Sequence, residues 1–303
     1  MNDILRAMTF VVLAGAVFFI VMFIEGFYLK VTRGKSGYYF KETLANMMTG
    51  FSYKLVDGLA IALFITAFAT YLNDVGVQWQ FESKIIEFIV IFVLADLLFY
   101  GMHVVAHKVR WFWCVHVTHH SSDHFNFSTA LRQNFLYAIQ GTWAFQWVPL
   151  ALLGFDPSLI LIAIEINLFY QFFIHTEAIK KLGWAEWIFN TPSHHRVHHG
   201  CNKEQIDCNF GGVLIVWDRL FGTFQSEENA GTIRYGVTRM PYSNTNPLYI
   251  QVYEVIDLFR DICRYKDLRL LFMHPDWVHQ HFGRQIKPTA QSPNELEKRE
   301  DLS

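Results

Sequence analysis

Long apolar runs separated by short polar segments dominate the first 175 residues of the chain. The runs cover residues 8–28, 55–72, 85–102, 135–155 and 157–174. A helix of about 20 apolar residues crosses a hydrocarbon core about 30 Å thick. Residues 154–157 form a turn of Gly-Phe-Asp-Pro, which predicts that the last two runs are a helical hairpin. The pattern predicts an all-α integral membrane bundle of about 4–5 spans, with the first run retained as a helix and not removed as a signal peptide.

The pattern changes after the last apolar run. Residues 200–225 are mixed and rich in turn formers, apolar residues recur at helical spacing over 246–271, and residues 285–303 are polar. We therefore divide the chain into N-terminal transmembrane helices (1–84), a catalytic region with the hairpin and the histidine motifs (85–225), C-terminal cytosolic helices (226–284) and a disordered tail (285–303).

Composition supports a membrane protein. Of the 303 residues, 52% are hydrophobic and 17% aromatic, and the mean hydropathy is +0.19, which is unusual for a water-soluble domain of this length. The formal net charge of −2 leaves no basic face for a nucleic-acid partner. Four cysteines without C-x-x-C spacing predict free thiols in a reducing compartment.

Lysine and arginine residues predict the orientation of the bundle. Of the 25 such residues, all except Arg6 and Lys84 lie in residues 30–54, in residues 103–134 or beyond residue 175. Cytoplasmic segments of membrane proteins carry this excess of positive charge. Five crossings would put the same segments on one side. We therefore expect every histidine motif to face the cytosol, beneath a bacterial inner membrane or the endoplasmic reticulum.

Histidines are concentrated between residues 103 and 199, which hold eleven of the fourteen in the chain. Eight of them form three motifs: His103-x-x-x-His107, His116-x-x-His119-His120 and His195-x-x-His198-His199. Residues four apart share one face of a helix. Imidazole is a good ligand for iron, copper, zinc and nickel, and so dense a set predicts a metal site of more than one ion. Beside apolar spans, such a site favours oxygen chemistry on a lipid.

Polar residues inside two of the apolar runs point to the same site. Asp96 lies two helical turns before His103, and we expect it to orient a metal-bound histidine, or else to make a hydrogen bond between helices. Asn167, Gln171 and His175 recur every four residues. This stripe makes His175 the ninth candidate ligand, the alternative being interfacial packing.

The remaining histidines have weaker spacing. We interpret His124 and His194 as neighbours of the site, and His274, His279 and His281 as surface residues. Glu165 has no evident role in the sequence.

The three histidine motifs resemble those of the fatty acid hydroxylase/sterol desaturase superfamily of membrane di-iron oxygenases, over about residues 96–224. Four runs are most similar to the alkylglycerol monooxygenase group within it: TALRQ at 129–133, YQFFIHTE at 170–177, TPSHHRVHHG at 191–200 and GVLIVWDRLFGTF at 212–224. The resemblance implies a helical bundle under a cytosolic helical cap that holds two irons. It carries ligand roles onto the nine candidates: His103, His107, His116, His119, His120, His175, His195, His198 and His199. Where fatty acid 2-hydroxylases have a further histidine, this chain has Gln171.

The implied reaction is O₂-dependent hydroxylation of a lipid C–H bond, with the ether-linked carbon of alkylglycerols as the implied target. A sterol desaturase or another lipid hydroxylase or desaturase of the superfamily is the alternative enzyme, because both reactions begin with the same hydrogen abstraction. A histidine-rich metal transporter is the alternative outside the enzymes. The chain has no iron–sulfur cysteine run and no dinucleotide-binding motif. An external reductant is therefore expected, a tetrahydropterin by resemblance, otherwise a cytochrome- or ferredoxin-type donor.

Overall fold

The computed structural model describes residues 2–77, 79, 81–237, 245–274 and 277, and the side chains of these residues from 15 onward. Over these ranges the fold is all-helical, as the apolar pattern predicts. Extended pairing is limited there to two isolated bridges, Phe189 with Leu214 and Gly200 with Tyr235. The predicted disordered tail, His279 and His281 lie outside the described residues.

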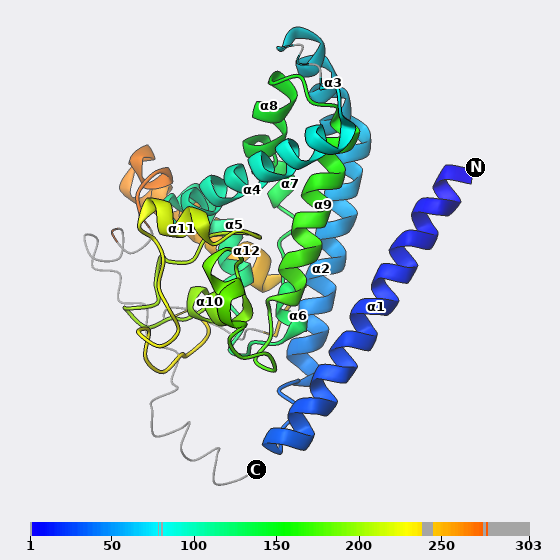
Figure 1. The fold of residues 1–303 in the computed structure, drawn as a ribbon. Coiled ribbons are helices and arrows are strands. Elements are labelled where there is room, and N and C mark those ends of the chain that lie inside the picture. Colours follow the sequence, from blue (N-terminus) through cyan, green and yellow to red (C-terminus); the bar gives the residue numbers. More distant parts are fainter. Residues whose placement is uncertain (1, 78, 80, 238–244, 275–276, 278–303) are drawn as a thin grey trace.

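Three helices of the bundle are long and apolar enough to cross a membrane. These are the described part of α1 (Asn2–Arg33), the continuous helix formed by α2 (Phe40–Ala60), η1 (Ile61–Ile65) and α3 (Thr66–Val75), and α4 (Lys84–Lys108). In Figure 1, α1 lies at the edge of the bundle and α4 crosses the direction of α2. Residues 30–54, expected to connect two spans, are therefore helical from Phe40 onward.

The expected span over residues 135–155 is not one helix. The structure has instead α7 (Tyr137–Gln140) and α8 (Ala144–Leu152), separated at Gly141. Gly141 adopts a left-handed conformation with φ of 88°, which ends a helix, and Pro149 inside α8 removes a backbone donor. The prediction of a span here was wrong because apolar composition alone does not reveal that these residues pack inside the bundle.

The last apolar run forms α9 (Pro157–Phe173), a helix of 17 residues. Its start is well defined, because Pro157 is the first helical residue and the Asp156 carboxylate accepts a hydrogen bond of 2.7 Å from Ser158 N. It is shorter than the three candidate spans. Glu165 on α9, whose role the sequence leaves open, pairs with Lys54 of α2 at 3.0 Å.

One apolar core holds α3, α4, α8 and α9 together. It contains buried residues from each of these helices and from η1, namely Ile65, Ala69, Ile91, Ala95, Trp147, Leu150, Ala151, Ile160, Ala163 and Ile164, with Phe155 from the turn before α9. Burying a large aliphatic side chain contributes about 1.5–3 kcal/mol. The core fixes the first part of α4, and the last part of the same helix continues into the histidine-bearing region.

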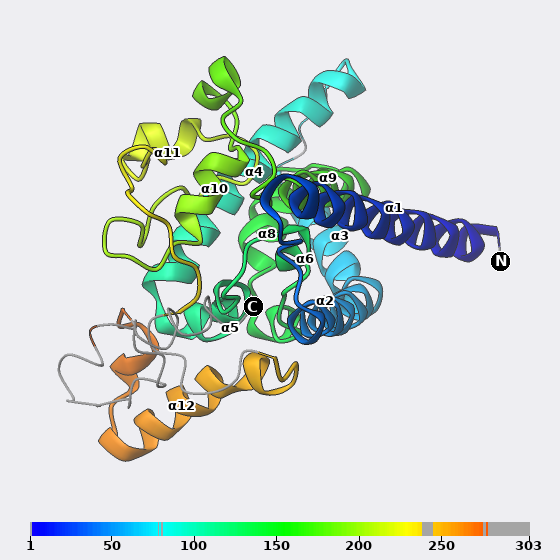
Figure 2. The same ribbon diagram turned by 90° about the horizontal axis from the view of Figure 1, so that it is seen from below.

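That region is built from short helical elements, namely α5 (Arg110–His120), α6 (Phe127–Ala130), η2 (Gly183–Trp187), α10 (Pro192–His198), α11 (Val216–Phe221), α12 (Tyr249–Tyr265) and η3 (Leu268–Leu271). Most of these elements lie beside the bundle (Figure 2), whereas α6 packs against α1, α2 and α9. α12 occupies the C-terminal stretch with apolar residues at helical spacing. It is held to α5 by the buried Arg110, which donates to Asp261 at 2.7 Å and to Glu254 at 3.3 Å.

The turn between α8 and α9 gives a test of this packing. Gly154 has φ of +86°, and an added Cβ would lie 1.8 Å from the carbonyl oxygen of Val77. We expect Gly154→Ala to lower the free energy of unfolding in detergent by about 2–4 kcal/mol, from left-handed strain plus overpacking. Gly141→Ala is the matched control, because Gly141 has a similar φ of +88° and open space around it. Equal losses in the two variants, measured by thermal unfolding, would contradict the tight contact at Gly154.

Candidate metal centre

Three helices, the C-cap of one of them and the segment after α9 bring the nine candidate histidines together. α4 carries His103 and His107 in its last two turns, α5 carries its three histidines in its second half, and α10 carries His195 and His198. His199 caps the C-terminus of α10, and His175 lies two residues beyond α9. The spacing of four within each helical motif puts the paired imidazoles on one face, as the sequence predicts.

The imidazoles form two compact groups. One group contains five histidines: His103, His107, His116, His120 and His198. The other contains four: His119, His175, His195 and His199. All nine residues are buried, and within each group one ring nitrogen of every member lies within 4.8 Å of those of the others. Each helical motif except that of α4 contributes to both groups.

Distances between the Nε2 atoms match those of ligands around a shared ion. In the five-histidine group the Nε2 atom of His116 lies 3.0 Å from that of His103 and 3.2 Å from that of His120. In the other group the separations are 3.1 Å for His119–His175, 2.9 Å for His175–His195 and 3.2 Å for His195–His199. Two nitrogens bound to one ion at about 2.1 Å and about 90° lie about 3.0 Å apart. The nitrogens therefore fit one ion per group.

The second ring nitrogen of several ligands is held by a backbone carbonyl. These Nδ1 donors are His103 to Phe210 O at 2.8 Å, His119 to Arg132 O at 3.2 Å, His175 to Gln171 O at 2.6 Å and His198 to Cys208 O at 2.8 Å. A proton fixed on Nδ1 leaves the lone pair on Nε2, which is the atom that a metal binds. The protein therefore sets both the orientation and the tautomer of these rings.

Two buried nitrogens in the five-histidine group have no protein partner within the described chain. They are Nε2 of His107 and Nε2 of His198. A buried polar atom without a hydrogen bond costs about 1–3 kcal/mol. A metal ion bound to both atoms would remove that cost, so the arrangement fits a metal and does not fit an ordinary polar core.

The imidazoles are neutral when buried in this way. Burial, followed by repulsion from neighbouring imidazoles, lowers the pKa of His116, His120 and His199 well below its ordinary value. Burial also lowers the pKa of His175 to about 3. Neutral rings keep their lone pairs available at pH 7, which is the form that coordinates a metal.

Asp96 does not bond any of the nine histidines, which corrects the expectation that it orients one directly. Its buried carboxylate accepts hydrogen bonds from four donors: Asn167 Nδ2 at 2.7 Å, Val213 N at 2.7 Å, Leu214 N at 3.0 Å and Trp217 Nε1 at 2.9 Å. The hydrogen bond to Asn167 joins α4 to α9. The other three fix the chain that leads into α11.

The loop that Asp96 holds is also held by Asp218. The Asp218 carboxylate accepts from Phe210 N at 2.7 Å and Gly211 N at 2.8 Å, and burial raises its pKa to about 6. The Phe210 carbonyl in turn anchors His103. A Cβ on Gly212 would lie 2.7 Å from Asn167 Oδ1 and 2.9 Å from Asp96 Oδ1. Asp96 thus acts on the centre through a tightly packed loop.

The polar stripe on α9 is a connected chain. Asn167 Nδ2 donates to Asp96, Gln171 Nε2 donates to Asn167 Oδ1 at 2.6 Å, and the Gln171 carbonyl accepts from His175. His175 belongs to the four-histidine group, whereas Asn167 and Gln171 are not among the grouped ligands. The side chain of Gln171 therefore supports the stripe, and its backbone orients the ligand.

Two further residues that hold the histidines were not predicted from the sequence. Tyr137 lies with its hydroxyl 2.5 Å from Nδ1 of His116, and the Asp207 carboxylate lies 3.5 Å from Nδ1 of His107. Asp207 also binds Lys108 and His274. A polar residue close after the third motif is a weak signal for Asp207, and Tyr137 gives none, because its place depends on the fold.

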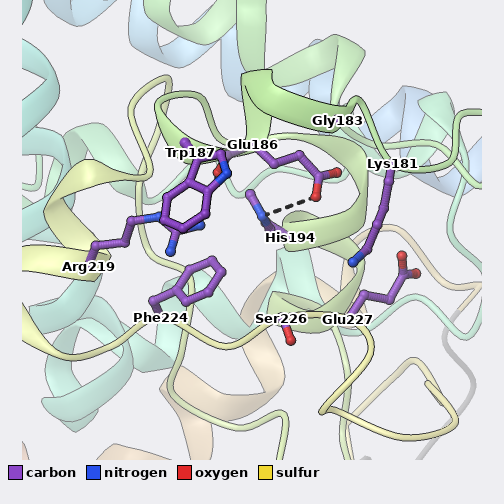
Figure 3. Close-up of a pocket in the computed structure, with 9 residues that line it drawn as sticks. All are labelled: Lys181, Gly183, Glu186, Trp187, His194, Arg219, Phe224, Ser226 and Glu227. Atoms are coloured by element: carbon purple, nitrogen blue, oxygen red, sulfur yellow. Dashed lines mark hydrogen bonds and ion pairs between the residues drawn. The ribbon is translucent and has the colours of Figure 1, made fainter.

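His124 and His194 lie outside both groups. His124 Nδ1 pairs with the buried Glu42 on α2. His194 lines a pocket of about 420 Å³ together with Lys181, Glu186 and Arg219 (Figure 3). Burial lowers the pKa of His194 to about 4, so its ring is neutral there.

Removal of single ligands gives a direct test of the two groups. We expect His119→Ala and His199→Ala to lose the ion of the four-histidine group, and His120→Ala and His198→Ala that of the five-histidine group, because each change leaves an ion under-coordinated. Metal analysis of the purified protein measures this. His124→Ala is the control and should keep both ions. Undiminished metal in all four ligand variants would contradict the assignment.

The role of Asp96 can be tested with an isosteric change. Asp96→Asn replaces one acceptor oxygen by an amide NH2, which cannot accept. The variant therefore loses the acceptor either of Asn167 Nδ2 and Val213 N, which share Oδ1, or of Leu214 N and Trp217 Nε1, which share Oδ2. We expect metal affinity to fall about 10–100-fold, as for other residues that position ligands. Glu165→Gln, on the exposed pair with Lys54, should leave affinity unchanged. An Asp96→Asn protein with normal affinity would show that the loop is held without this carboxylate.

Comparison with known proteins gives an independent view of the same residues. A profile of the fatty acid hydroxylase family matches residues 88–223. The alkylglycerol monooxygenases of Xenopus tropicalis and Homo sapiens are each 42% identical over 190 residues, which is 61% of this chain and 41% of theirs. An ornithine lipid hydroxylase of Rhizobium tropici is 28% identical over 161 residues, 53% of this chain and 47% of its own.

The chain spans about two fifths of the length of the alkylglycerol monooxygenases that it matches. No solved structure matches. The family match encloses all nine grouped histidines, together with Asp96 and the loop that it holds. Residues 88–223 are therefore similar to the fatty acid hydroxylase family over the whole of the histidine-bearing centre.

Proposed function

We propose that this protein is a membrane-bound di-iron oxygenase that uses O₂ to hydroxylate a lipid, at the ether-linked carbon of alkylglycerols. The observation that carries the proposal is the pair of buried histidine groups at the end of an apolar bundle. Relatives at 42% identity that are alkylglycerol monooxygenases support this substrate. The match of the family profile supports the reaction class.

Two iron ions fit the donor set. Each group offers only neutral imidazole nitrogens, in numbers sufficient for four or more bonds to one ion, and the grouped residues include no carboxylate or thiolate. When bound, two ferrous ions supply electrons for the reduction of O₂. The protein holds the rings, keeps water away from the centre and presents one C–H bond of the lipid.

An aromatic cluster supports a lipid route to the centre along α1 and α9. Phe169 is 47% exposed on the bundle surface and contacts Phe173 with ring centres 5.1 Å apart. Phe172 is buried, stacking on Phe18 at 4.1 Å and on Phe127 at 5.2 Å. Phe172 and Phe173 lie three and two residues before His175 along the chain. A lipid tail entering between α1 and α9 would therefore meet an apolar surface up to the four-histidine group.

The direction of the bundle is part of the proposal. The distribution of lysine and arginine supports a cytosolic position for the histidine groups, in a multi-pass protein of a bacterial inner membrane or the endoplasmic reticulum. A cytosolic centre can receive electrons from a soluble donor. The donor proposed is a tetrahydropterin, with a cytochrome or ferredoxin as the alternative.

A sterol hydroxylase and a metal transporter are the two alternative functions. A relative at 25% identity that is a cholesterol 25-hydroxylase supports a sterol as the second candidate substrate. A metal transporter would need ligands along the spans, whereas the grouped histidines gather at one end of α4 and beyond it.

Product analysis separates these functions. Purified, iron-loaded protein would be supplied with ¹⁸O₂, a tetrahydropterin and, separately, an alkylglycerol, a sterol and a fatty acyl lipid. We expect O₂-dependent loss of the alkylglycerol with one labelled oxygen in the product, because hydroxylation at the ether-linked carbon inserts one atom of O₂. His199→Ala should be inactive and Glu165→Gln active. Turnover of the sterol alone would move the assignment to the second candidate, and no oxidation of any lipid would contradict the enzyme proposal.

A further inference from the structure

The segment after His175 exposes a group of large apolar side chains that the metal centre does not use. Trp184 is 75% exposed, Trp187 is 69% exposed and Leu220 is 70% exposed. Together with their exposed neighbours they form what we call the aromatic patch, which consists of Ile179, Leu182, Trp184, Trp187, Ile188, Leu220 and Phe221. Soluble surfaces seldom carry so many large apolar residues together.

Local structure forces both tryptophans outward. Residues three apart in a 3-10 helix lie directly above one another, so Trp184 and Trp187 share one face of η2. Glu186, on a different face, is turned toward α10, where it accepts from Ser193 Oγ at 2.7 Å, and it also accepts from Leu182 N at 3.1 Å. The polar side of η2 therefore has its hydrogen-bond partners within the protein. Its apolar side, with Trp184 and Trp187, is exposed.

The patch is a fixed surface and not a loose loop. The guanidinium carbon of Arg219 lies 4.8 Å from the Trp187 ring centre and 3.7 Å from that of Phe224 (Figure 3). Ile215 N donates to Ile188 O at 3.0 Å. These contacts join η2 to α11, so Leu220 and Phe221 move with the tryptophans.

Two candidate spans hold the patch at the end of the bundle where the histidines lie. Arg33, the last residue of α1, pairs with Glu177 at 2.9 Å, two residues before the patch begins. Phe221 stacks on Tyr100 of α4 with ring centres 5.4 Å apart, between Asp96 and the α4 ligands. Arg33 ends its helix, and Tyr100 lies two residues before the end of the apolar run 85–102, so both ties are near the boundary between hydrocarbon and water.

We propose that the aromatic patch lies in the headgroup layer of the membrane and seats the histidine-bearing region on the lipid surface. Tryptophan prefers this layer, since its ring is apolar and its N–H needs a polar partner. Lys180 and Lys181, both exposed, lie inside the same segment. Lys181 pairs with the exposed Glu228 at 2.6 Å, and Lys180 complements anionic lipid phosphates. Binding of a protein partner would explain neither the cationic residues nor the contacts that the patch and the nearby Glu177 make with α4 and α1. The inference rests on the membrane placement of the chain and not on its reaction.

Spin labelling in lipid nanodiscs tests the depth of the patch. Cys114, Cys201 and Cys208 are buried and Cys263 is exposed, so Cys263→Ser provides a background for a single nitroxide label. Labels would be placed by Trp184→Cys, by Leu220→Cys and, as control, by Arg260→Cys on the outer face of α12, which lies on the other side of the region from α11 in Figure 2. Collision with O₂ and with a water-soluble nickel chelate reports depth.

We expect nitroxide labels at positions 184 and 220 to collide more often with O₂ than with the nickel chelate. For the label at position 260 we expect the opposite. Lys180→Glu combined with Lys181→Glu should shift the label at 184 toward water in nanodiscs rich in anionic lipid. Access of nickel to 184 and 220 equal to that at 260 would overturn the proposal. Dipolar broadening between labels, showing a second copy seated on the patch, would also overturn it. Neither result depends on turnover, so failure here is distinct from failure of the proposed reaction.

Discussion

Nine neutral imidazoles buried around two points are the constraint on which the rest of this structure depends. Burial removes the hydration of each ring, so two requirements apply: one nitrogen binds a metal and the other binds a protein group. The Nδ1 atom of His195 is an exception, with no partner within the described chain. Carbonyl groups satisfy the second requirement for four of the rings, at Gln171, Arg132, Cys208 and Phe210. A carbonyl is free to accept such a bond where a helix has just ended or the chain is irregular. The short elements and turns around the centre follow from that need.

The bundle supplies the rigidity that these irregular segments lack. α4 packs against α8 and α9 through one apolar core, and the buried Asp96 projects from α4 to hold the loop at 213–217. A carboxylate inside an apolar span is costly unless its acceptor sites are filled, and here four donors fill them. The same residue therefore stabilises the bundle and fixes the loop whose carbonyl orients His103. Packing in the membrane and ligand geometry are energetically linked.

Much of the centre could be predicted from the sequence, because its ligands sit on helices. A spacing of four residues puts His103 and His107 on one helix face, and His116 and His120 on another, however the helices pack. The division into groups of five and four could not be predicted, since it depends on how α5 and α10 cross. Asp207 and Tyr137 were missed for the same reason. The prediction of one span over residues 135–155 was wrong, because Gly141 ends a helix there and Pro149 removes a backbone donor. Apolar composition alone does not show either effect.

α4 has one feature whose consequence reaches beyond any single side chain. It carries Asp96, which fixes the loop, and His103 and His107, which face the centre, on one uninterrupted helix. Insertion or deletion of one residue between them would rotate the two ends by about 100° and separate them by about 1.5 Å. Asp96 and the two histidines could not then meet their partners together. In descendants of this chain, side chains along the lipid-facing side of α4 are free to vary, whereas the length from Asp96 to His107 is not.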